Sequence, residues 1–299
     1  MKSRLKNLYI WFDYEVLLPF LALLPNRLGR YLAKLRGILY YHKKRDWRIF
    51  TYGDYTLWDR TYKSYKEIYP KLTHKKILHL VKERSIYQSY EEFEAAKINN
   101  RTYMNIPVEY LGKDGVEEYL KKHENVIFAT CHFGSIVGLI NLHIFKKPMI
   151  HMSSNVTKQN LVHPSITQFY IKKYLIGNEY MNGGKILDVE NNNKKILKFL
   201  KNGGSLSSVA DLPAANPMNE AFWKKFFGKQ RALSSAIHRL SQKYGIKIMP
   251  YVCYYEKGKY IMKFAGADED MYKFFEDEIK KRPGMWWASD LLSHYLTKE

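Results

Sequence analysis

Hydrophobic and polar positions along the chain predict a long series of helices and strands. Apolar residues recur at helical spacing in four segments, residues 63–97, 114–123, 163–177 and 231–245. Short apolar runs that predict strands occupy residues 104–112, 125–131, 147–154 and 205–211, and a further strand pair turns near Lys257 and Gly258. Because strands alternate with helices, we expect an α/β fold with a mostly parallel central sheet flanked by helices.

The first 48 residues follow a different pattern and predict two helices that are broken near Pro25. Their apolar run, residues 8–24, is shorter than the roughly 20 residues that span a bilayer. It also contains Asp13, Glu15 and Pro19, which disfavour a membrane span. Several basic residues follow this run: Arg27, Arg30, Lys34, Arg36, Lys43, Lys44, Arg45 and Arg48.

Two interpretations of this N-terminal segment stay open. An apolar stretch rich in Trp and Tyr beside a basic cluster is typical of helices that lie in the interface of an anionic membrane. A helix pair packed on its own domain produces the same pattern, and one helix can do both. We therefore expect residues 1–48 to form a helical membrane-association segment, and residues 49–299 to form the α/β domain.

Composition and charge narrow the classes of function. Of the 299 residues 46% are hydrophobic, which excludes a disordered chain. The formal net charge of +20 implies an anionic partner, such as nucleic acid, a phospholipid surface or an acidic carrier protein. No motif that reads nucleic acid occurs, so we expect no nucleic-acid partner. The two cysteines, Cys131 and Cys253, and the scattered histidines predict neither a disulfide framework nor a metal site.

Two polar residues stand at the ends of predicted strands. His132 follows the strand over residues 125–131, and Asp211 is the last residue of the strand over residues 205–211. In sheets of parallel strands, functional sites form at the carboxyl ends of the strands. We therefore expect both side chains at the same edge of the sheet.

Four motifs follow one another in a characteristic order. They are "NVIFATCHFGS", "MNGGKILDVENNNKKILKFLKNGGSLSSVADLP", "FFGKQRALSSAIHRLSQKYGIKIMPYVCYYEKGKY" and "KKRPGMWW". In this order they resemble the lysophospholipid acyltransferase superfamily, in particular its bacterial lipid A (lauroyl or myristoyl) acyltransferase branch. The resemblance covers nearly the whole chain.

The resemblance implies a mechanism in which His132 deprotonates an acceptor hydroxyl that attacks an acyl thioester. In that family a carboxylate five residues after the histidine orients and charges the imidazole. Here that position is Val137, and the residues before it are Ser135 and Ile136. The departure leaves the acidic partner of His132 to be identified.

Four explanations of this departure stay open. Asp211, which matches an acidic position of the family, takes the orienting role. Alternatively, His132 works without a carboxylate, steered by a backbone carbonyl or by Ser135, an arrangement that suits an amine acceptor. In the third explanation Cys131 is an acylated nucleophile, although adjacent strand residues point to opposite faces. In the fourth, the chain keeps the fold and binds an acyl group or a partner without turnover.

The resemblance also implies roles for residues outside this pair. Ser135 and nearby backbone amides are candidate oxyanion or orienting groups, and Gly134 is a candidate substrate-binding residue. Gly183 and Gly184 would line the acyl or phosphate site, although turn residues give the same pattern. The region from Phe227 and Gly228 through Arg231 would border the acceptor site. His238, Trp286 and Trp287 are expected to be structural.

From the resemblance we expect an acyltransferase that uses an acyl carrier protein or coenzyme A thioester as co-substrate, with no further cofactor. Its acceptor would be a hydroxyl or an amine, and it would act at the cytoplasmic side of the cell membrane as a peripheral protein. The alternative is an altered or inactive relative that binds an acyl group, carrier or membrane in a lipid, glycan or natural-product assembly pathway.

Overall fold

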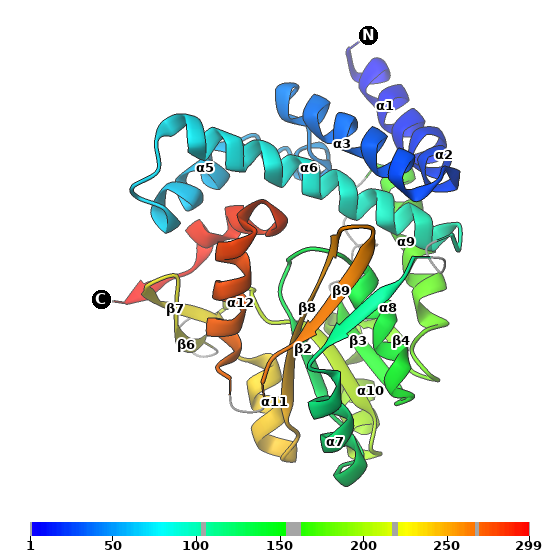
Figure 1. The fold of residues 1–299 in the computed structure, drawn as a ribbon, viewed down its shortest axis with the longest axis vertical. Helices are drawn as coiled ribbons and strands as arrows, with labels where there is room; N and C mark the ends of the chain where they lie inside the picture. The colour runs from blue at the N-terminus through cyan, green and yellow to red at the C-terminus, as the bar shows by residue number, and fades with distance from the viewer. Residues whose placement is uncertain (1, 103–105, 154–162, 217–220, 267–268, 299) are drawn as a thin grey trace.

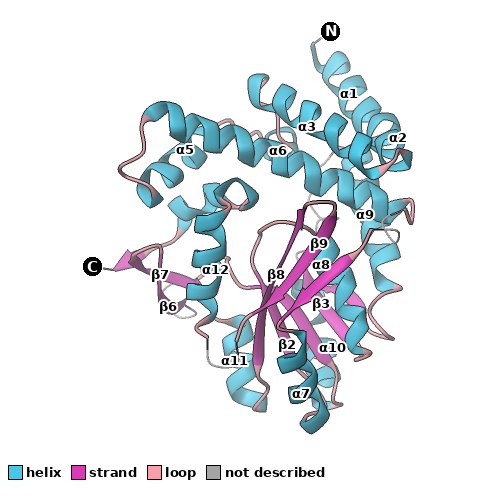
Figure 2. Cartoon of the chain, viewed as in Figure 1, coloured by secondary structure: helices cyan, strands magenta, loops and turns pink. Residues whose placement is uncertain are grey.

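The computed structural model describes residues 2–102, 106–153, 163–216, 221–266 and 269–298, and it confirms the predicted α/β class (Figure 1). Within these residues a seven-stranded sheet has the strand order β1-β9-β8-β2-β5-β3-β4. Strands β2, β3, β4, β5 and β8 run parallel, whereas β9 returns antiparallel to β8 and pairs with β1. A second sheet is antiparallel, with the order β10-β7-β6, and lies beside α12 (Figure 2).

The strands of the large sheet are β1 (Val108–Leu111), β2 (Ile127–Thr130), β3 (Met149–Ser153), β4 (Lys185–Asp188), β5 (Ser205–Val209), β8 (Ile248–Glu256) and β9 (Lys259–Phe264). Those of the second sheet are β6 (Ala221–Phe226), β7 (Lys229–Ser234) and β10 (Thr297–Lys298). The helices after residue 100 are α7 (Lys113–Lys122), α8 (Val137–Asn141), α9 (Pro164–Asn178), α10 (Val189–Lys201), α11 (Ala236–Tyr244) and α12 (Met271–Lys281). Short 3-10 helices are η2 (Leu142–Phe145), η4 (Pro283–Met285) and η5 (Ser289–His294).

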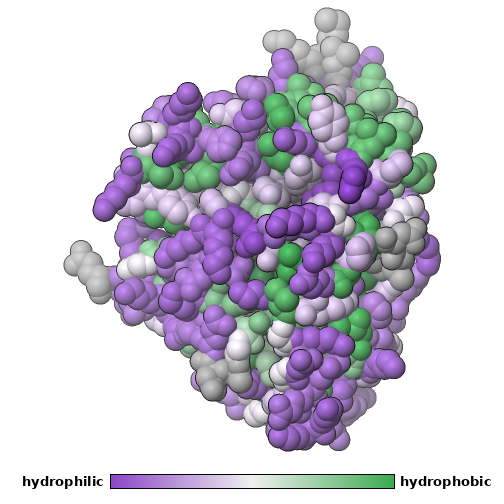
Figure 3. Space-filling view, in the orientation of Figure 1, coloured by the Kyte–Doolittle hydropathy of each residue, from purple (hydrophilic) through white to green (hydrophobic). Residues whose placement is uncertain are grey.

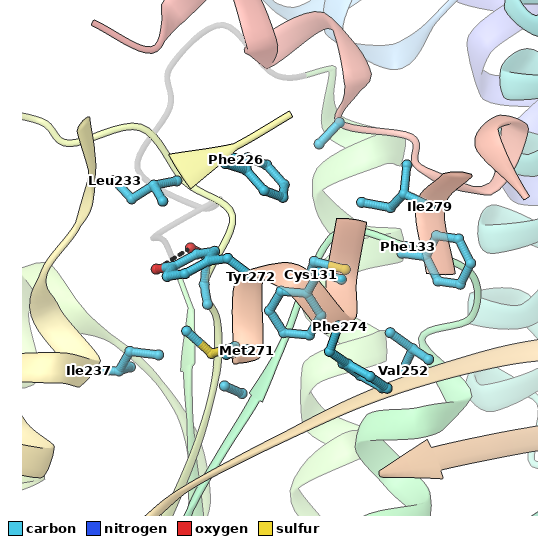
Figure 4. Packing of buried hydrophobic residues seen from close by; sticks show 14 of the residues in the cluster. Cys131, Phe133, Phe226, Leu233, Ile237, Val252, Met271, Tyr272, Phe274 and Ile279 are labelled. Atoms are coloured by element: carbon cyan, nitrogen blue, oxygen red, sulfur yellow. Dashed lines mark hydrogen bonds between the residues drawn. The ribbon is translucent and has the colours of Figure 1, made fainter. Parts of the chain in front are cut away.

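Helices cover both faces of the large sheet and enclose two apolar clusters. Successive residues of β2 point to opposite faces. Ile127 and Ala129 therefore pack in the cluster that α10, α11 and α12 cover, whereas Phe128 packs in the cluster beneath α7 and α8. Figure 4 shows part of the first cluster, in which Cys131 lies among aromatic side chains such as Phe274. The alternation places the backbone of His132 at the end of a strand that is buried on both sides.

The segment predicted as one helix over residues 63–97 is two helices. The structure has α5 at Leu57–Ile68 and α6 at His74–Asn99, with Pro70 in the connection. Proline lacks a backbone donor and disfavours helical geometry in the residue before it, so the periodic pattern is interrupted there. Thr73 then begins α6 by accepting a hydrogen bond from the Lys76 amide. The long α6 passes across one end of the large sheet (Figure 1).

The helix predicted over residues 231–245 begins later than expected. Residues up to Ser234 belong to β7, where Arg231 and Leu233 pair with residues of β6. Only the part from Ala236 to Tyr244 is helical, and Gly245 ends it with a positive φ of 64°. Small residues at helical spacing also fit an alternating strand, so the pattern did not distinguish the two. Of the strand predicted over residues 104–112, β1 covers the last part, and Met104 and Asn105 lie outside the described residues.

The N-terminal helices are α1 (Lys2–Phe12), the π-helical turn η1 (Asp13–Leu17), α2 (Leu18–Leu23) and α3 (Asn26–His42), followed by α4 (Trp47–Tyr52). The predicted break near Pro25 is present between α2 and α3. Both α2 and α3 pack against α6. None of the helices within the described ranges is long and apolar enough to cross a bilayer.

A buried polar cluster joins these helices to α6. The guanidinium of Arg36 donates to both oxygens of Asp13 and, at 2.5 Å, to Glu92 of α6. Tyr14 donates to Glu92 at 2.7 Å, and Tyr40 donates to Asp13. Asp13, one of the two acidic residues that disfavoured a membrane span, is therefore a buried ion-pair partner. Arg36, in turn, is unavailable to an anionic surface.

Candidate active site

A cavity of about 490 Å³ opens at the carboxyl ends of β2, β3 and β5, between these strands and helices α6 and α9. Its walls combine strand ends, the loop after β2 and the inner faces of both helices. Apolar side chains from α6, α8, β4 and β8 line one part, represented by Ile98, Leu139, Ile186 and Tyr251. Polar side chains line another part and include His132. The cavity lies where a parallel sheet commonly holds its functional groups.

His132 and Asp211 meet at this edge of the sheet. His132 Nδ1 lies 2.8 Å from Asp211 Oδ1, and the His132 backbone amide donates to Asp211 Oδ2 at 2.9 Å. The histidine side chain is 16% exposed, whereas the aspartate side chain is fully buried. Because Nδ1 bonds the carboxylate, Nε2 is the ring nitrogen left for a reacting group. The prediction that these residues share one edge is confirmed.

Asp211 is held by donors from the C-terminal segment. Trp286 Nε1 donates to Asp211 Oδ2 at 2.8 Å, and the Tyr295 hydroxyl donates to the Asp211 backbone carbonyl at 2.7 Å. Burial alone would raise the pKa of Asp211. The positive charge and hydrogen bonds of His132, with the Trp286 bond, outweigh burial and lower the pKa of that carboxyl. Asp211 is therefore ionised at neutral pH.

Val137 occupies a different environment. It is the first residue of α8, has no exposed surface, and packs with Ile98, Ile140 and Cys253. It does not line the cavity. The carboxylate that bonds His132 thus comes from the end of β5, from a residue 79 positions further along the chain.

Ser135 lines the cavity, and its hydroxyl is bonded to α6. Its hydroxyl donates to Glu94 Oε2 at 2.6 Å and accepts from the Val137 amide at 3.1 Å. Glu94 Oε1 in turn accepts from Arg30 of α3 at 2.6 Å. The hydroxyl hydrogen expected at an oxyanion is therefore bound to a carboxylate in this arrangement.

Gly134 borders the cavity, and no residue with a side chain fits at this position. Its φ is +72°, and a Cβ at this position would lie 2.0 Å from the Cys253 carbonyl oxygen. Its amide donates to the Met285 carbonyl at 2.9 Å, and the Ser135 amide donates to the Cys253 carbonyl at 2.7 Å. Both backbone donors proposed for an oxyanion are thus paired with protein acceptors.

The other candidate substrate-binding residues lie away from His132. Gly183 and Gly184 precede β4, at the amino ends of the parallel strands. A Cβ on Gly184 would lie 1.8 Å from the Met149 carbonyl oxygen. They do not line the cavity, because they stand where the strands begin and His132 stands where they end. Gly184 allows close approach of two backbones there.

Phe227 and Gly228 border a separate surface hollow together with charged residues of α12. Arg231 is buried, with its guanidinium donating to Glu67 at 2.6 Å and to the Phe226 carbonyl at 2.9 Å. None of these three residues lines the cavity that contains His132. The structure therefore does not bring this group to His132, and the acceptor-site role implied for it has no geometric support at the cavity.

Cys131 has the properties of a core residue. It is 3% exposed and packs in the apolar cluster of Figure 4. Burial, followed by the nearby charge of Asp211, raises the pKa of its thiol well above the ordinary value. A protonated thiol is a poor nucleophile, so this environment does not favour an acylated Cys131.

Several residues that line the cavity were not predicted from the sequence to belong to the site. Trp287 packs edge-on against His132, with ring centroids 4.4 Å apart, and its amide donates to the His132 carbonyl. The aromatic pair of the motif KKRPGMWW was the available signal for it. Gln88, Glu91 and Lys173 also line the cavity, from α6 and α9. Nothing in their local sequence distinguishes them from other helical polar residues. In the described part of the chain, no group of three or more His, Cys, Asp or Glu side chains is arranged to hold a metal ion.

Residues 75–287 match the model of a family described as bacterial lipid A biosynthesis acyltransferase. The matched range contains α6 from its second residue, the large sheet, His132, Asp211 and the tryptophan pair. A comparison with curated proteins found no match.

Proposed function

Because the chain belongs to the family of bacterial lipid A biosynthesis acyltransferases, as its motif order predicted, we propose that it transfers an acyl group from an acyl carrier protein or coenzyme A thioester to an acceptor hydroxyl or amine. The observation that carries the proposal is the bond between His132 Nδ1 and Asp211 Oδ1, at 2.8 Å. It supplies the carboxylate–histidine pair that such a reaction needs, although the motif position is Val137.

In the proposed reaction His132 Nε2 takes the proton of the acceptor hydroxyl as its oxygen attacks the thioester carbonyl carbon. A C–O bond forms, the C–S bond breaks, and the protonated imidazole returns the proton to the departing thiolate. Asp211 stabilises the positive ring and fixes the proton on Nδ1, so the lone pair of Nε2 faces the acceptor. Trp286 holds the carboxyl group by a hydrogen bond to Oδ2, and Tyr295 holds the backbone of Asp211 through its carbonyl.

A transfer assay tests this proposal. The protein is incubated with a lipid extract and with radiolabelled acyl carrier protein or acyl-coenzyme A, and labelled lipid is measured. We expect transfer by the wild type and its loss in His132→Ala. Equal labelling by both proteins, or none with any donor and acceptor, would favour the alternative in which the chain binds an acyl group or carrier without turnover.

We also propose that α1, α2 and α3 rest on an anionic membrane surface. Large apolar side chains on these helices and on η1 are 39–67% exposed: Leu8, Trp11, Phe12, Val16, Phe20, Leu23, Leu28, Tyr31, Leu35 and Leu39. Figure 3 shows apolar side chains gathered over this end of the molecule. Arg27, Lys34, Lys43 and Lys44 are exposed nearby, whereas Arg30 and Arg36 are buried in ion pairs. Each exposed cation near anionic lipid adds about 1 kcal/mol of attraction.

A further inference from the structure

One wall of the cavity holds a buried ion pair that the proposed reaction does not use. Lys173 Nζ of α9 lies 3.7 Å from Glu91 Oε1 of α6, and the two side chains are only 9% and 8% exposed. Both residues line the cavity that contains His132. The separation is longer than a direct hydrogen bond, and buried charges are costly unless hydrogen bonds satisfy them. The pair therefore has hydrogen-bonding capacity to offer a ligand.

Two further polar groups beside this pair lack partners. Gln88, one helical turn before Glu91, is 4% exposed, and its Oε1 has no hydrogen-bond partner among the described residues. His151 Nδ1 is also buried and without a partner in the described part of the chain. Burial, with the charges of Lys173 and His132, lowers the pKa of His151 to about 4, so its ring is neutral. Unpaired buried polar groups are rare and expensive in proteins.

We propose that Gln88, Glu91, Lys173 and His151 form a polar subsite that binds a second hydroxyl of an uncharged, polyhydroxylated acceptor while its reacting hydroxyl faces His132. This inference rests on the proposed function, since it describes the acceptor of that reaction. A hydroxyl both donates and accepts, so one hydroxyl donates to Glu91 and accepts from Lys173. A neighbouring hydroxyl donates to the free carbonyl of Gln88.

Charged acceptors fit the polar subsite less well. An ammonium group would donate to Glu91 but would face the charge of Lys173. A phosphate or carboxylate would accept from Lys173 but would face the charge of Glu91. In a buried site such like-charge contacts cost more than at the surface, because the effective dielectric is lower. The apolar part of the same cavity, around Ile98, Leu139 and Ile186, is suited to a hydrocarbon chain.

Binding of three twelve-carbon ligands tests the polar subsite without requiring turnover. Dodecyl glucoside, dodecylamine and dodecyl phosphate share one tail and differ in the charge of the head group. Below the critical micelle concentration of each ligand, titration calorimetry on the wild type is expected to show at least tenfold tighter binding of the glucoside. Equal or tighter binding of the amine or the phosphate would overturn the proposal.

Two charge-removing variants are expected to change the preference in opposite directions. Glu91→Gln leaves Lys173 unopposed, so binding of dodecyl phosphate should tighten about tenfold while the glucoside weakens. Lys173→Met leaves Glu91 unopposed and should favour dodecylamine instead. Loss of folding alone cannot produce this reversal. An unchanged order of the three ligands in folded samples of both variants would contradict the assignment. Glu117→Gln, in the exposed pair with Lys113, is the matched control and should keep the wild-type order.

Gln88→Met gives a variant that does not depend on the ion pair. Because the Gln88 carbonyl is unpaired, the substitution should leave the melting temperature equal or higher. It should nevertheless weaken glucoside binding about fivefold, the value of one hydrogen bond. Unchanged glucoside affinity would remove Gln88 from the subsite.

If the binding order holds but His132→Ala leaves transfer unaffected, the subsite stands and the proposed reaction fails. If transfer depends on His132 but the binding order does not hold, the reaction stands and the subsite fails.

Discussion

His132 owes its geometry to a carboxylate that is buried and surrounded by donors. Asp211 receives bonds from the side chain and the amide of His132 and from Trp286, so none of its lone-pair directions points into open solvent. Its lowered pKa follows from these bonds despite complete burial. Val137, by contrast, contributes only to apolar packing with residues such as Ile140.

Restoring a carboxylate at the motif position is expected to harm the protein. Val137→Glu would place a charged group among Ile98, Ile140 and Cys253 without a partner, which costs several kcal/mol of folding free energy. The midpoint of urea denaturation should fall and the transfer rate should not rise. Val137→Ile, which keeps the site apolar, is the control and should cost no more than about 3 kcal/mol. A faster Val137→Glu enzyme of normal stability would show that the motif geometry survives.

The candidate pair itself could be found in the sequence, because both residues end buried strands. The contacts of Ser135 could not. Its partner Glu94 lies 41 positions earlier on a helix whose polar residues carry no distinguishing pattern. The positions of Glu91 and Gln88 in the cavity could not be found either. Polar residues of α6 are buried because other helices cover α6 on several sides.

Helix α6 is the element that connects the separate parts of the fold. Over its 26 residues it contacts α2, α3, α5, α8 and α9. It carries Glu92 to the Arg36 cluster, Glu94 to Ser135, and Gln88 and Glu91 to the cavity. The N-terminal helices are therefore joined to the loop after β2 by buried charges on a single helix.

The Arg36 cluster is expected to be essential for this packing. Arg36→Met would leave Asp13 and Glu92 buried without their cation, and breaking such a buried pair costs about 3–5 kcal/mol. The measurement is the free energy of unfolding from urea denaturation. Arg101→Met removes an arginine from the exposed pair with Glu179 and should cost no more than about 1 kcal/mol. Similar costs for both variants would mean that the buried cluster contributes little.

Most elements were predictable from periodicity and turn residues, and the exceptions have identifiable causes. Pro70 divides a segment whose periodicity is otherwise continuous, which leaves α5 and α6 separate. The strand β7 is fixed by pairing with β6 and with β10 from the far end of the chain, a long-range contact that local spacing does not encode.

At the scale of the whole molecule, the basic residues behind the net charge of +20 serve two different purposes. Some of the 49 basic residues neutralise buried carboxylates and so add nothing to the net charge, as Arg36 does with Asp13 and Arg84 with Asp46. The remainder includes exposed residues on the N-terminal helices, beside the apolar surface that they present (Figure 3). Sequence alone could not separate these two groups, because burial depends on how α1, α2 and α3 pack against α6.

The proposed membrane surface is expected to respond to both of its components. Phe20→Asp combined with Leu23→Asp should reduce binding to vesicles of phosphatidylglycerol and phosphatidylcholine at least tenfold, because about 0.025 kcal/mol per Å² of apolar contact is lost. Binding by the wild type should weaken with added salt. The measurement is co-sedimentation with the vesicles. Leu296→Asp, at an exposed leucine near β10, is the control and should bind as the wild type does. Equal binding by the double variant and the wild type would place the membrane contact elsewhere.

The most direct test of the central assignment is the single-turnover rate of acyl transfer by Asp211→Asn, compared with the wild type. An asparagine has the same size as the aspartate, but it is neutral and has one acceptor oxygen in place of two. The fold should therefore persist, while the ring of His132 loses its anionic partner. By analogy with the loss of an orienting aspartate in serine hydrolases, we expect a fall of about ten-thousand-fold. A rate within a few fold of the wild type would show that His132 does not depend on Asp211.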